Sequence, residues 1–537
     1  MLWLALHLPL LSLEAFCATL DAARRAGPVA LLAEHRIVAV NAAAAARGVT
    51  AGAKRATALA LAPEILLGQA DARRDALALQ ALAHVALVFT PAVTQHGAQA
   101  VLLELQACLR YWGGLPPLLA RLRAALRPLG HRVQMAAAPT ALGAALLAGW
   151  HEAAGRQGRA DFTQGAHVTQ LPALQALLEG APVWLLGPGR EHWEALQGMG
   201  LQTLADLRAL PRSGLARRFG AALLDDLDRA RGERPDPRRW LAPPETFDSP
   251  LELFARADSS AQVLHGAAVL LARLVAWAQA RQARVAAFTL RMRHEPRHRR
   301  DDGQPAAPHT DLRIELAEPA ADAAHLQALL HERLARVQLT APTLELRLLC
   351  HELVHAEAPN GELFPTRASE AEGLTRLLER LRARLGDAQV QRLQLLPDHR
   401  PERATTAAPA FAAQPAGRVG PVPGPSAGPS AGQAAGRQAM HPAGDATGGP
   451  LPLHRPVWLL AAPQPLADRQ SLPHCEGRPL VLLSGPERIE AGWWDGAPAV
   501  RDYFIAQHDS GALLWIYRAR LPSAAEGEGW FLHGRFG

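Results

Sequence analysis

A chain of 537 residues, of which 49% are hydrophobic, is too long for one core, so several domains are predicted. Lysine and arginine exceed aspartate and glutamate by 56 to 50, which modestly favours a polyanionic partner. The four cysteines lie far apart without a Cys-x-x-Cys pair or Cys/His cluster, which argues against a zinc site or a disulfide framework and fits a reducing cytosol.

The first thirteen residues are almost entirely apolar and predict a buried strand. No lysine or arginine precedes the apolar run, and His7 and Pro9 interrupt it, so a signal peptide is disfavoured and a secreted protein is the minor alternative. Nowhere are there about 18 uninterrupted apolar residues, the length that a membrane span needs. We therefore expect a cytoplasmic protein.

Two more segments complete the N-terminal pattern. Residues 37–52 predict a short alanine-rich helix followed by a tight turn at Gly48 and Gly52. Residues 89–105 end in a strand, because Val101 and Leu103 alternate with the residues between them.

These three segments resemble the palm and fingers of the Y-family (UmuC-like) translesion DNA polymerases. In that family, the first strand carries Asp-x-Asp and the later strand an Asp-Glu pair, which together bind two magnesium ions. The resemblance puts Leu6 and Leu8 at the first pair, and Gln99 and Ala100 at the second. Magnesium needs anionic oxygen ligands, so we expect a degenerate catalytic site without metal or cofactor.

The fingers have lost their ligands as well. The family's tyrosine and arginine, which hold the incoming triphosphate, fall at Ala42 and Ala45, whereas Arg47 lies two residues away from the motif position. Two independent losses, of metal ligands and of triphosphate ligands, predict a chain that is not a nucleotidyl transferase. The alternative is an active Y-family polymerase that uses displaced acids such as Glu14 and Glu104.

Residues 185–210 read as a helix-hairpin-helix. Gly198 and Gly200 allow a close turn, and Thr203 can cap the next helix with Asp206 three residues on. Such a hairpin presents backbone N–H groups to a DNA phosphate. Arginines follow it, as in the family's thumb. The arginines expected to contact the DNA backbone are Arg212, Arg217, Arg218, Arg291 and Arg293.

Residues 245–350 resemble the family's little finger, a four-stranded sheet backed by two helices. Periodicity predicts helices over 263–279 and 321–337 and strands over 284–293, 310–316 and 343–350. For the loop at 298–303, which mixes arginines with two aspartates, DNA contact and simple solvation are equally supported.

Beyond this sheet, residues 358–365 occupy the place where related proteins carry a peptide that docks on the sliding clamp. Leu363 and Phe364 match its hydrophobic anchors, and Asn360 stands at its glutamine position. The alternative is that both apolar residues pack into the domain. Residues 405–450 are almost entirely Ala, Pro, Gly, Ser and Gln, which predicts a disordered linker.

Residues 451–537 regain aromatic residues and predict a separate β-rich module, with strands over 479–484, 500–507 and 512–518. Its last residues, 530–537, are the predicted partner contact, because chain ends usually fray unless something binds them. The alternative is that the aromatic residues build a small core. The partner-binding candidates are Trp530, Phe531 and Phe536.

The chain is thus identified as an α+β multidomain protein with the Y-family right-hand architecture. The missing acids, the clamp peptide and the C-terminal W-F-L-H-G-R-F-G resemble an inactive subgroup encoded in bacterial damage-induced mutagenesis cassettes. The predicted parts are palm and fingers (1–165), thumb (166–242), little finger (243–352), clamp peptide with closing helix (353–404), linker (405–450) and C-terminal module (451–537).

The resemblance implies a non-catalytic adaptor at the nucleoid that takes part in damage-induced translesion synthesis. Its implied partners are damaged or primer-template DNA, the sliding clamp, a RecA-like accessory protein (ImuA) and an error-prone C-family DNA polymerase. No membrane is implied. A protein-interaction hub that never touches DNA remains the alternative if the thumb arginines are only solvated.

Overall fold

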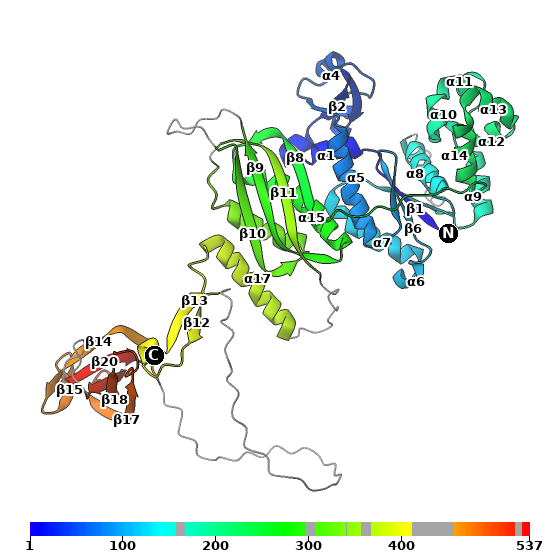
Figure 1. Cartoon of the computed structure of the whole chain (residues 1–537). Helices are drawn as coiled ribbons and strands as arrows, with labels where there is room; N and C mark the ends of the chain where they lie inside the picture. The colour runs from blue at the N-terminus through cyan, green and yellow to red at the C-terminus, as the bar shows by residue number, and fades with distance from the viewer. Residues whose placement is uncertain are drawn as a thin grey trace, which may run out of the picture. The chain divides into compact units, whose positions relative to one another are not determined.

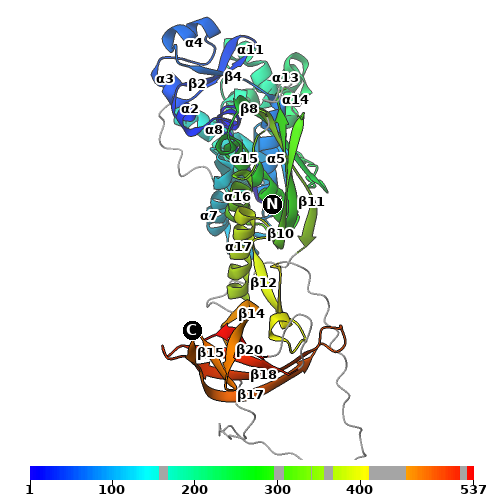
Figure 2. The same cartoon turned by 90° about the vertical axis from the view of Figure 1, so that its left-hand side faces the viewer.

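The protein folds as two compact units, Met1–Leu385 and Gly386–Gly537, each with its own sheets and hydrophobic core (Figures 1 and 2). The first unit combines sheets with helices and the second is built of strands, which confirms the predicted α+β class with a separate β-rich C-terminal module. The computed structural model describes residues 1–156, 167–295, 307–339, 341–355, 367–410, 455–520 and 529–536.

A four-stranded antiparallel sheet, in the order β5-β6-β1-β7, forms the centre of the N-terminal part. Successive side chains of a strand point to opposite faces. Leu4 and Leu6 therefore pack against helices α5 and α7, whereas Trp3, Ala5 and Leu102 pack against helix α8 (Figure 1). These elements are β1 (Trp3–His7), α5 (Ala72–Leu87), β5 (Val93–His96), β6 (Ala100–Glu104), α6 (Leu109–Trp112), α7 (Leu115–Leu126), β7 (Gln134–Ala138) and α8 (Ala141–Arg156).

A smaller sheet, in the order β3-β2-β4, has its own core around Ile37, Ala44 and Val49. Gly48 and Gly52 have φ angles of 82° and 88°, so they form the left-handed turn that was predicted after the alanine-rich helix α3. The elements here are α1 (Leu11–Cys17), α2 (Ala22–Ala26), β2 (Val29–Ala33), β3 (Arg36–Val40), α3 (Ala42–Ala46), α4 (Arg55–Leu61) and β4 (Leu66–Gln69).

Short helices follow and share their core with α8 through leucines such as Leu196, Leu207 and Leu223. The predicted capping box is present: the Thr203 hydroxyl accepts from the Asp206 N–H, and the Asp206 carboxylate accepts from the Thr203 N–H. The helices are α9 (Leu171–Glu179), α10 (Gly187–Glu191), α11 (Trp193–Gly198), α12 (Leu204–Arg208), α13 (Arg212–Phe219) and α14 (Ala221–Arg231).

The second large sheet of this unit is antiparallel, in the order β10-β9-β11-β8, and two helices cover one of its faces. The strands and helices predicted between residues 263 and 350 are confirmed, and β8 supplies the fourth strand. The elements are β8 (Phe247–Ala257), α15 (Ser260–Ala280), β9 (Ala283–His294), β10 (His309–Ala320), α16 (Ala323–Leu334), β11 (Thr343–His355) and α17 (Arg367–Leu385).

Among the described residues, α15 is the one helix long and apolar enough to cross a membrane by length and composition. Here it is a core helix. Val263, Leu270, Leu274 and Trp277 are buried against the sheet, and Ala276 joins the core around α5.

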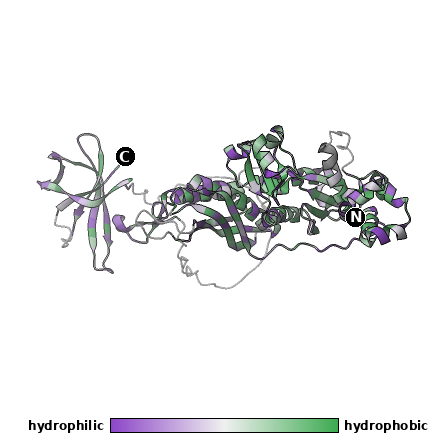
Figure 3. Cartoon of the chain, turned by 90° about the horizontal axis from the view of Figure 1, so that it is seen from above, coloured by the Kyte–Doolittle hydropathy of each residue, from purple (hydrophilic) through white to green (hydrophobic). Residues whose placement is uncertain are grey.

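The second unit is dominated by a seven-stranded sheet in the order β16-β15-β14-β20-β19-β18-β17. The first and last strands in this order, β16 and β17, are consecutive in the chain, with Leu480 between them. The Leu480 N–H donates to the carbonyl of Pro473 in β15 at 2.9 Å. The strands of this sheet carry both hydrophobic and hydrophilic residues (Figure 3). The strands are β12 (Gln391–Leu395), β13 (Thr405–Pro409), β14 (Trp458–Arg469), β15 (Leu472–Cys475), β16 (Arg478–Pro479), β17 (Val481–Ala491), β18 (Ala499–Gln507), β19 (Leu513–Ala519) and β20 (Gly529–Arg535).

Residues 386–410 also belong to this second unit, so the module begins well before residue 451, where it was predicted to start. Arg400 forms an ion pair with Asp495 at 2.6 Å, and Arg501 donates to Glu402 at 3.0 Å. Because Arg501 is only 5% exposed, Glu402 neutralises a buried guanidinium. The predicted linker therefore starts and ends in the same unit, and its first residues are strand β13.

Candidate functional site

The ends of β1 and β6 are where the resemblance places metal ligands. The register of the two strands sets His7 opposite Ala100 and Leu6 opposite Val101. Directly paired residues share one face of a sheet, so Leu6 and Leu8 point away from Ala100, into the fully buried core beside α5 and α7. His7 rather than Leu6 therefore stands beside Ala100.

Gln99 and Ala100 lie where the β5–β6 hairpin turn enters β6. The Gln99 side chain is exposed, while its carbonyl accepts a hydrogen bond from the Leu8 N–H at 2.8 Å. Ala100 is 5% exposed. An amide and a methyl group offer no anionic oxygen, so neither residue can act as the carboxylate ligand that a divalent cation needs.

A guanidinium lies near the imidazole of His96, the last residue of β5. Arg238 Nη1 is 3.3 Å from His96 Nδ1, and Arg238 forms an ion pair with Asp236. Burial, and then the positive charge of Arg238, lowers the pKa of His96, which is therefore neutral at pH 7. In the part of the chain that the structure describes, no group of three or more His, Cys, Asp or Glu side chains could hold a metal ion.

The two displaced acids lie apart from this place. Glu104 pairs with Trp3, at the opposite end of β1 from His7, and its carboxylate accepts from the Gln106 N–H at 3.1 Å. Glu14 lies on α1, where it accepts from the Arg132 N–H at 2.9 Å. Both carboxylates thus have local hydrogen-bond partners at separate sites.

The finger positions carry no group that could hold a triphosphate. Ala42 and Ala45 lie on the exposed side of α3, which is capped by the Asn41 side chain at the Ala44 N–H. Arg47 pairs with Glu64 at 2.7 Å, so its charge is already neutralised.

The hairpin between α11 and α12 is the segment expected to contact the DNA backbone. Gly200 has a φ of 80° and makes the predicted turn, whereas Gly198 is the last residue of α11. The N–H groups of Gln202 and Thr203 donate to the Asp206 carboxylate at 3.0 and 2.8 Å, and these bonds lower the pKa of Asp206. The Asp206 carboxylate thus occupies the Gln202 and Thr203 N–H groups at the start of α12, as the predicted capping box requires for Thr203.

The five arginines expected to contact DNA fall into two groups. Arg212 binds Asp228, Arg291 binds Asp311 through two hydrogen bonds, and Arg293 binds Glu345 at 2.8 Å. Arg217 and Arg218 are exposed near the end of α13, and neither is in an ion pair among the residues described here. Of the five arginines, Arg217 and Arg218 are therefore the strongest candidates for contact with DNA phosphates.

The C-terminal aromatic residues are less accessible than predicted. Trp530 and Phe531 are 4% and 9% exposed, because β20 lies between β14 and β19 in the interior of the sheet. Phe536 is half-buried against the same core. The segment is therefore a core strand and not a frayed end, which removes the reason for predicting it as a partner contact.

Sequence reasoning missed a better contact candidate in the turn between β17 and β18. Trp493 and Trp494 are 80% and 53% exposed and stack edge to face, with ring centroids 5.4 Å apart. The next residue, Asp495, is held by Arg400 and Arg403, so the turn is fixed. The sequence signal that could have found them is two adjacent tryptophans followed by Asp-Gly, which is typical of a turn. A turn cannot bury two adjacent tryptophan side chains, so at least one of them is exposed.

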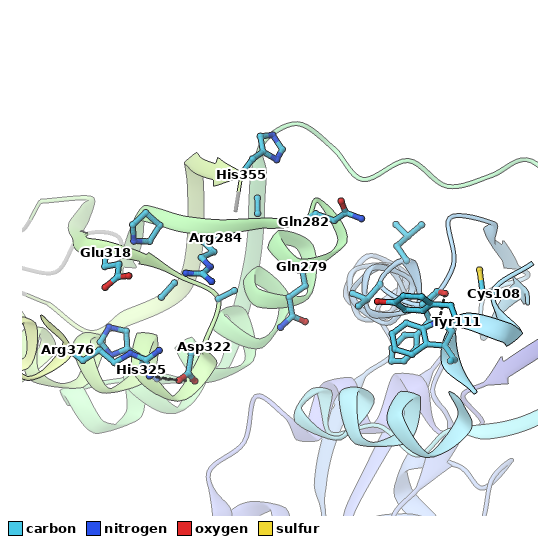
Figure 4. A pocket seen from close by; sticks show the side chains of 18 of the residues that line it. Cys108, Tyr111, Gln279, Gln282, Arg284, Glu318, Asp322, His325, His355 and Arg376 are labelled. Carbon is cyan, nitrogen blue, oxygen red and sulfur yellow. Dashed lines mark hydrogen bonds and ion pairs between the residues drawn. The ribbon is translucent and has the colours of Figure 1, made fainter. Parts of the chain in front are cut away.

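A cavity of about 1280 Å³ lies elsewhere in the first unit (Figure 4). Cys108 and Tyr111 form one side, beyond the end of β6 that is remote from Ala100, and His325 and Arg376 lie on the other. It is therefore not a catalytic pocket at the polymerase-like position. The predicted clamp peptide, Asn360, Leu363 and Phe364, lies outside the described residues.

Comparison with known proteins identifies relatives. Residues 11–149 match the model of the impB/mucB/samB family. The chain is 29% identical to Protein ImuB of Caulobacter vibrioides NA1000 / CB15N, over 91% of this chain and all of that protein, and ImuB of a second strain of that species gives the same values. Two solved structures, a Dbh ternary complex and a Dbh–Dpo4 Y-family DNA polymerase chimera, have TM-scores of 0.36 and 0.35 at 14% and 13% identity, covering 65% of this chain and 98% of each.

Proposed function

Residues 11–149 form an impB/mucB/samB domain, the UmuC-like domain of the Y family, and from this premise we propose that the chain is a DNA-bound adaptor in translesion synthesis. It does not polymerise DNA itself. It brings an error-prone C-family polymerase to the lesion.

One observation carries the non-catalytic part of the proposal: the residues at the polymerase-like strand ends are His7, Gln99 and Ala100. Two-metal phosphoryl transfer needs carboxylates that hold both cations near the attacking and leaving oxygens. The rival, an active polymerase that uses Glu14 and Glu104, requires two acids that have separate local partners to converge on one site.

DNA binding is the second part of the proposal, and it rests on Arg217 and Arg218. Both guanidinium groups are exposed on α13. Such groups bind the DNA backbone by neutralising phosphates and releasing counterions, without reading the base sequence.

Partner recruitment is the third part. The clamp contact is assigned to Asn360, Leu363 and Phe364. The second unit recruits the RecA-like accessory protein (ImuA) or the C-family polymerase, and its contact is Trp493 with Trp494. The sequence from 451 to 537 has eight arginines, no lysine and nine acidic residues, so it lacks the excess positive charge typical of a nucleic-acid surface.

Primer extension and DNA gel shift on the same purified protein test the proposal. We expect no nucleotide incorporation with magnesium or manganese, together with salt-sensitive binding to primer-template DNA. An active Y-family polymerase in parallel reactions controls for the assay. Template-dependent incorporation that co-purifies with the protein and disappears in Glu104→Gln would favour the rival.

A further inference from the structure

A buried arginine lies where α15 meets the palm helix α5. Arg273 is 5% exposed, and its one hydrogen bond among the described residues is to the Ser249 hydroxyl, at 3.2 Å. Burial lowers the pKa of Arg273 to about 10, so the guanidinium is still charged at pH 7. A buried charge with no counter-charge is costly, typically by several kcal/mol.

The guanidinium lines a cavity of about 220 Å³ between α5, α15 and β8. His84 of α5 lines the same cavity; it is 3% exposed, and its Nε2 has no hydrogen-bond partner within the described ranges. Gln80 and Thr246 contribute further polar groups. A second cavity, of about 390 Å³, also reaches Arg273, but its wall carries the acids Asp71, Glu252 and Glu345 as well as Arg73 and Arg74, so it does not favour an anion.

The charge balance of the small cavity favours an anion. Burial lowers the pKa of His84 to about 4, so at pH 7 the ring is neutral and can donate one N–H without adding charge. The one carboxylate in the described wall, Asp248, is already bound by both nitrogens of the Arg347 fork. His84 Nε2 is thus an unpartnered group that can donate a hydrogen bond beside the Arg273 cation.

We propose that this cavity is a binding site for a phosphate group. Arg273 supplies the charge, His84 Nε2 and the Ser249 hydroxyl supply directed donors, and the volume admits an oxyanion of that size. Planar guanidinium groups are the preferred partners of phosphate oxygens. Since α5 belongs to the palm and β8 and α15 to the little-finger sheet, the bound phosphate would link these two parts.

The test is thermal unfolding of the full chain in a buffer without phosphate, titrated with inorganic phosphate, pyrophosphate or a deoxynucleoside triphosphate at matched ionic strength. A ligand that binds only the folded state raises Tm in a saturable way. We expect this rise with inorganic phosphate. If the deoxynucleoside triphosphate raises Tm at a lower concentration than inorganic phosphate does, the bound phosphate group belongs to a nucleotide. If the triphosphate raises Tm equally or less, the ligand is free phosphate.

Arg273→Met is the decisive variant. It removes the charge while keeping an unbranched apolar side chain, so phosphate affinity should fall about tenfold to a hundredfold. Without phosphate, its Tm should be equal to or above that of the wild type, because the buried charge is gone. Arg256→Met, an exposed arginine on β8 outside the cavity, is the matched control and should keep the response.

Ser249→Ala provides a second, milder variant and should weaken phosphate binding several-fold. No saturable response in the wild type would overturn the proposal. An unchanged response in Arg273→Met would overturn it as well, and so would an Arg273→Met variant whose Tm is lowered equally with and without phosphate, since that is the behaviour of a packing residue.

Discussion

Arginines on the exposed face of β9, β10 and β11 are neutralised by carboxylates beside them. Exposed ion pairs of this kind contribute only about 0–1 kcal/mol each. Their larger effect is on the electrostatic potential of this face of the sheet. Because the paired cations and anions alternate along the face, these pairs leave no excess positive charge there. The pairs are Arg291–Asp311, Arg293–Glu345, Arg313–Glu315, Arg313–Glu352 and Arg347–Asp248.

The double variant Arg217→Ala with Arg218→Ala should therefore weaken DNA binding. Removing one phosphate-binding charge should flatten the slope of log affinity against log salt by about 0.9. The matched control is Arg291→Ala with Arg293→Ala, in which the removed charges were already paired, so the slope should change less. Fluorescence anisotropy across a salt series measures both, and a larger effect in the control would move the DNA surface to the sheet.

His84 should make the folded state sensitive to mild acid. Its pKa is lowered to about 4 by burial, so between about pH 6.5 and 4 the unfolded chain takes up a proton that the folded chain does not. Stability should fall through that window as pH decreases, by at most about 1.4 kcal/mol per pH unit. His84→Leu should lose the share of this dependence that His84 contributes, whereas His533, whose pKa burial also lowers to about 4, keeps its own.

Urea unfolding at pH 7.5 and 5.0, in buffer without phosphate, measures the effect. The exposed His351 gives the control His351→Leu, which should behave as the wild type does. Equal pH dependence in His84→Leu and the wild type would show that another group dominates.

At the scale of single elements, what could be predicted depended on local patterns. The strand at 284–293 and the capping box at Thr203 have signatures within a few residues. The residue of β1 that stands beside Ala100 had no such signature, because Leu4 and Leu6 are buried on one face of β1 and Trp3 and Ala5 on the other, and a strand buried on both faces has no alternation to fix its register. At the hairpin, the Asp206 carboxylate of this capping box accepts from the Gln202 and Thr203 N–H groups, while the DNA contact through Gly198 and Gly200 stays a prediction.

The turn between β17 and β18 should be a recruiting element that the fold does not need. Trp493→Ala with Trp494→Ala should abolish capture of the accessory protein or the partner polymerase, since exposed aromatic side chains are typical interface hot spots. Tm should change little, because both rings are largely in solvent.

Trp530→Ala is the contrasting variant, since it removes a buried tryptophan ring instead of an exposed one. It should lower the free energy of unfolding by about 3–5 kcal/mol. Pull-down and thermal unfolding of both variants separate the roles. Full partner capture by the Trp493/Trp494 double variant would place the contact on another surface.

At the scale of the whole molecule, the second unit has two separated pieces of sequence. The shorter piece, residues 386–410, supplies the Arg400 and Glu402 side chains that pair with Asp495 and Arg501. Nothing near residue 400 signals partners 95 and 99 positions away, which is why sequence patterns placed the boundary at residue 451.

A fragment of residues 386–537 should therefore fold cooperatively, whereas a fragment of residues 451–537 should not. The shorter fragment deprives the buried Arg501 guanidinium of the Glu402 carboxylate, a defect that typically costs about 3–5 kcal/mol. Amide NMR dispersion and thermal unfolding of the two fragments provide the comparison. A well-folded shorter fragment would show that residues 386–410 are dispensable.

The same ion pairs have a consequence for a broken chain. Residues 386–410 and 455–536 enter the second unit from opposite ends of one long connection, so that connection is a covalent loop on an assembled unit. A protease cut between residues 411 and 454 would leave two polypeptides that remain associated through Arg400, Asp495, Glu402 and Arg501. The nicked protein would elute as one species under native conditions and separate only in denaturant, so cleavage there would not detach residues 455–536 from the rest of the protein.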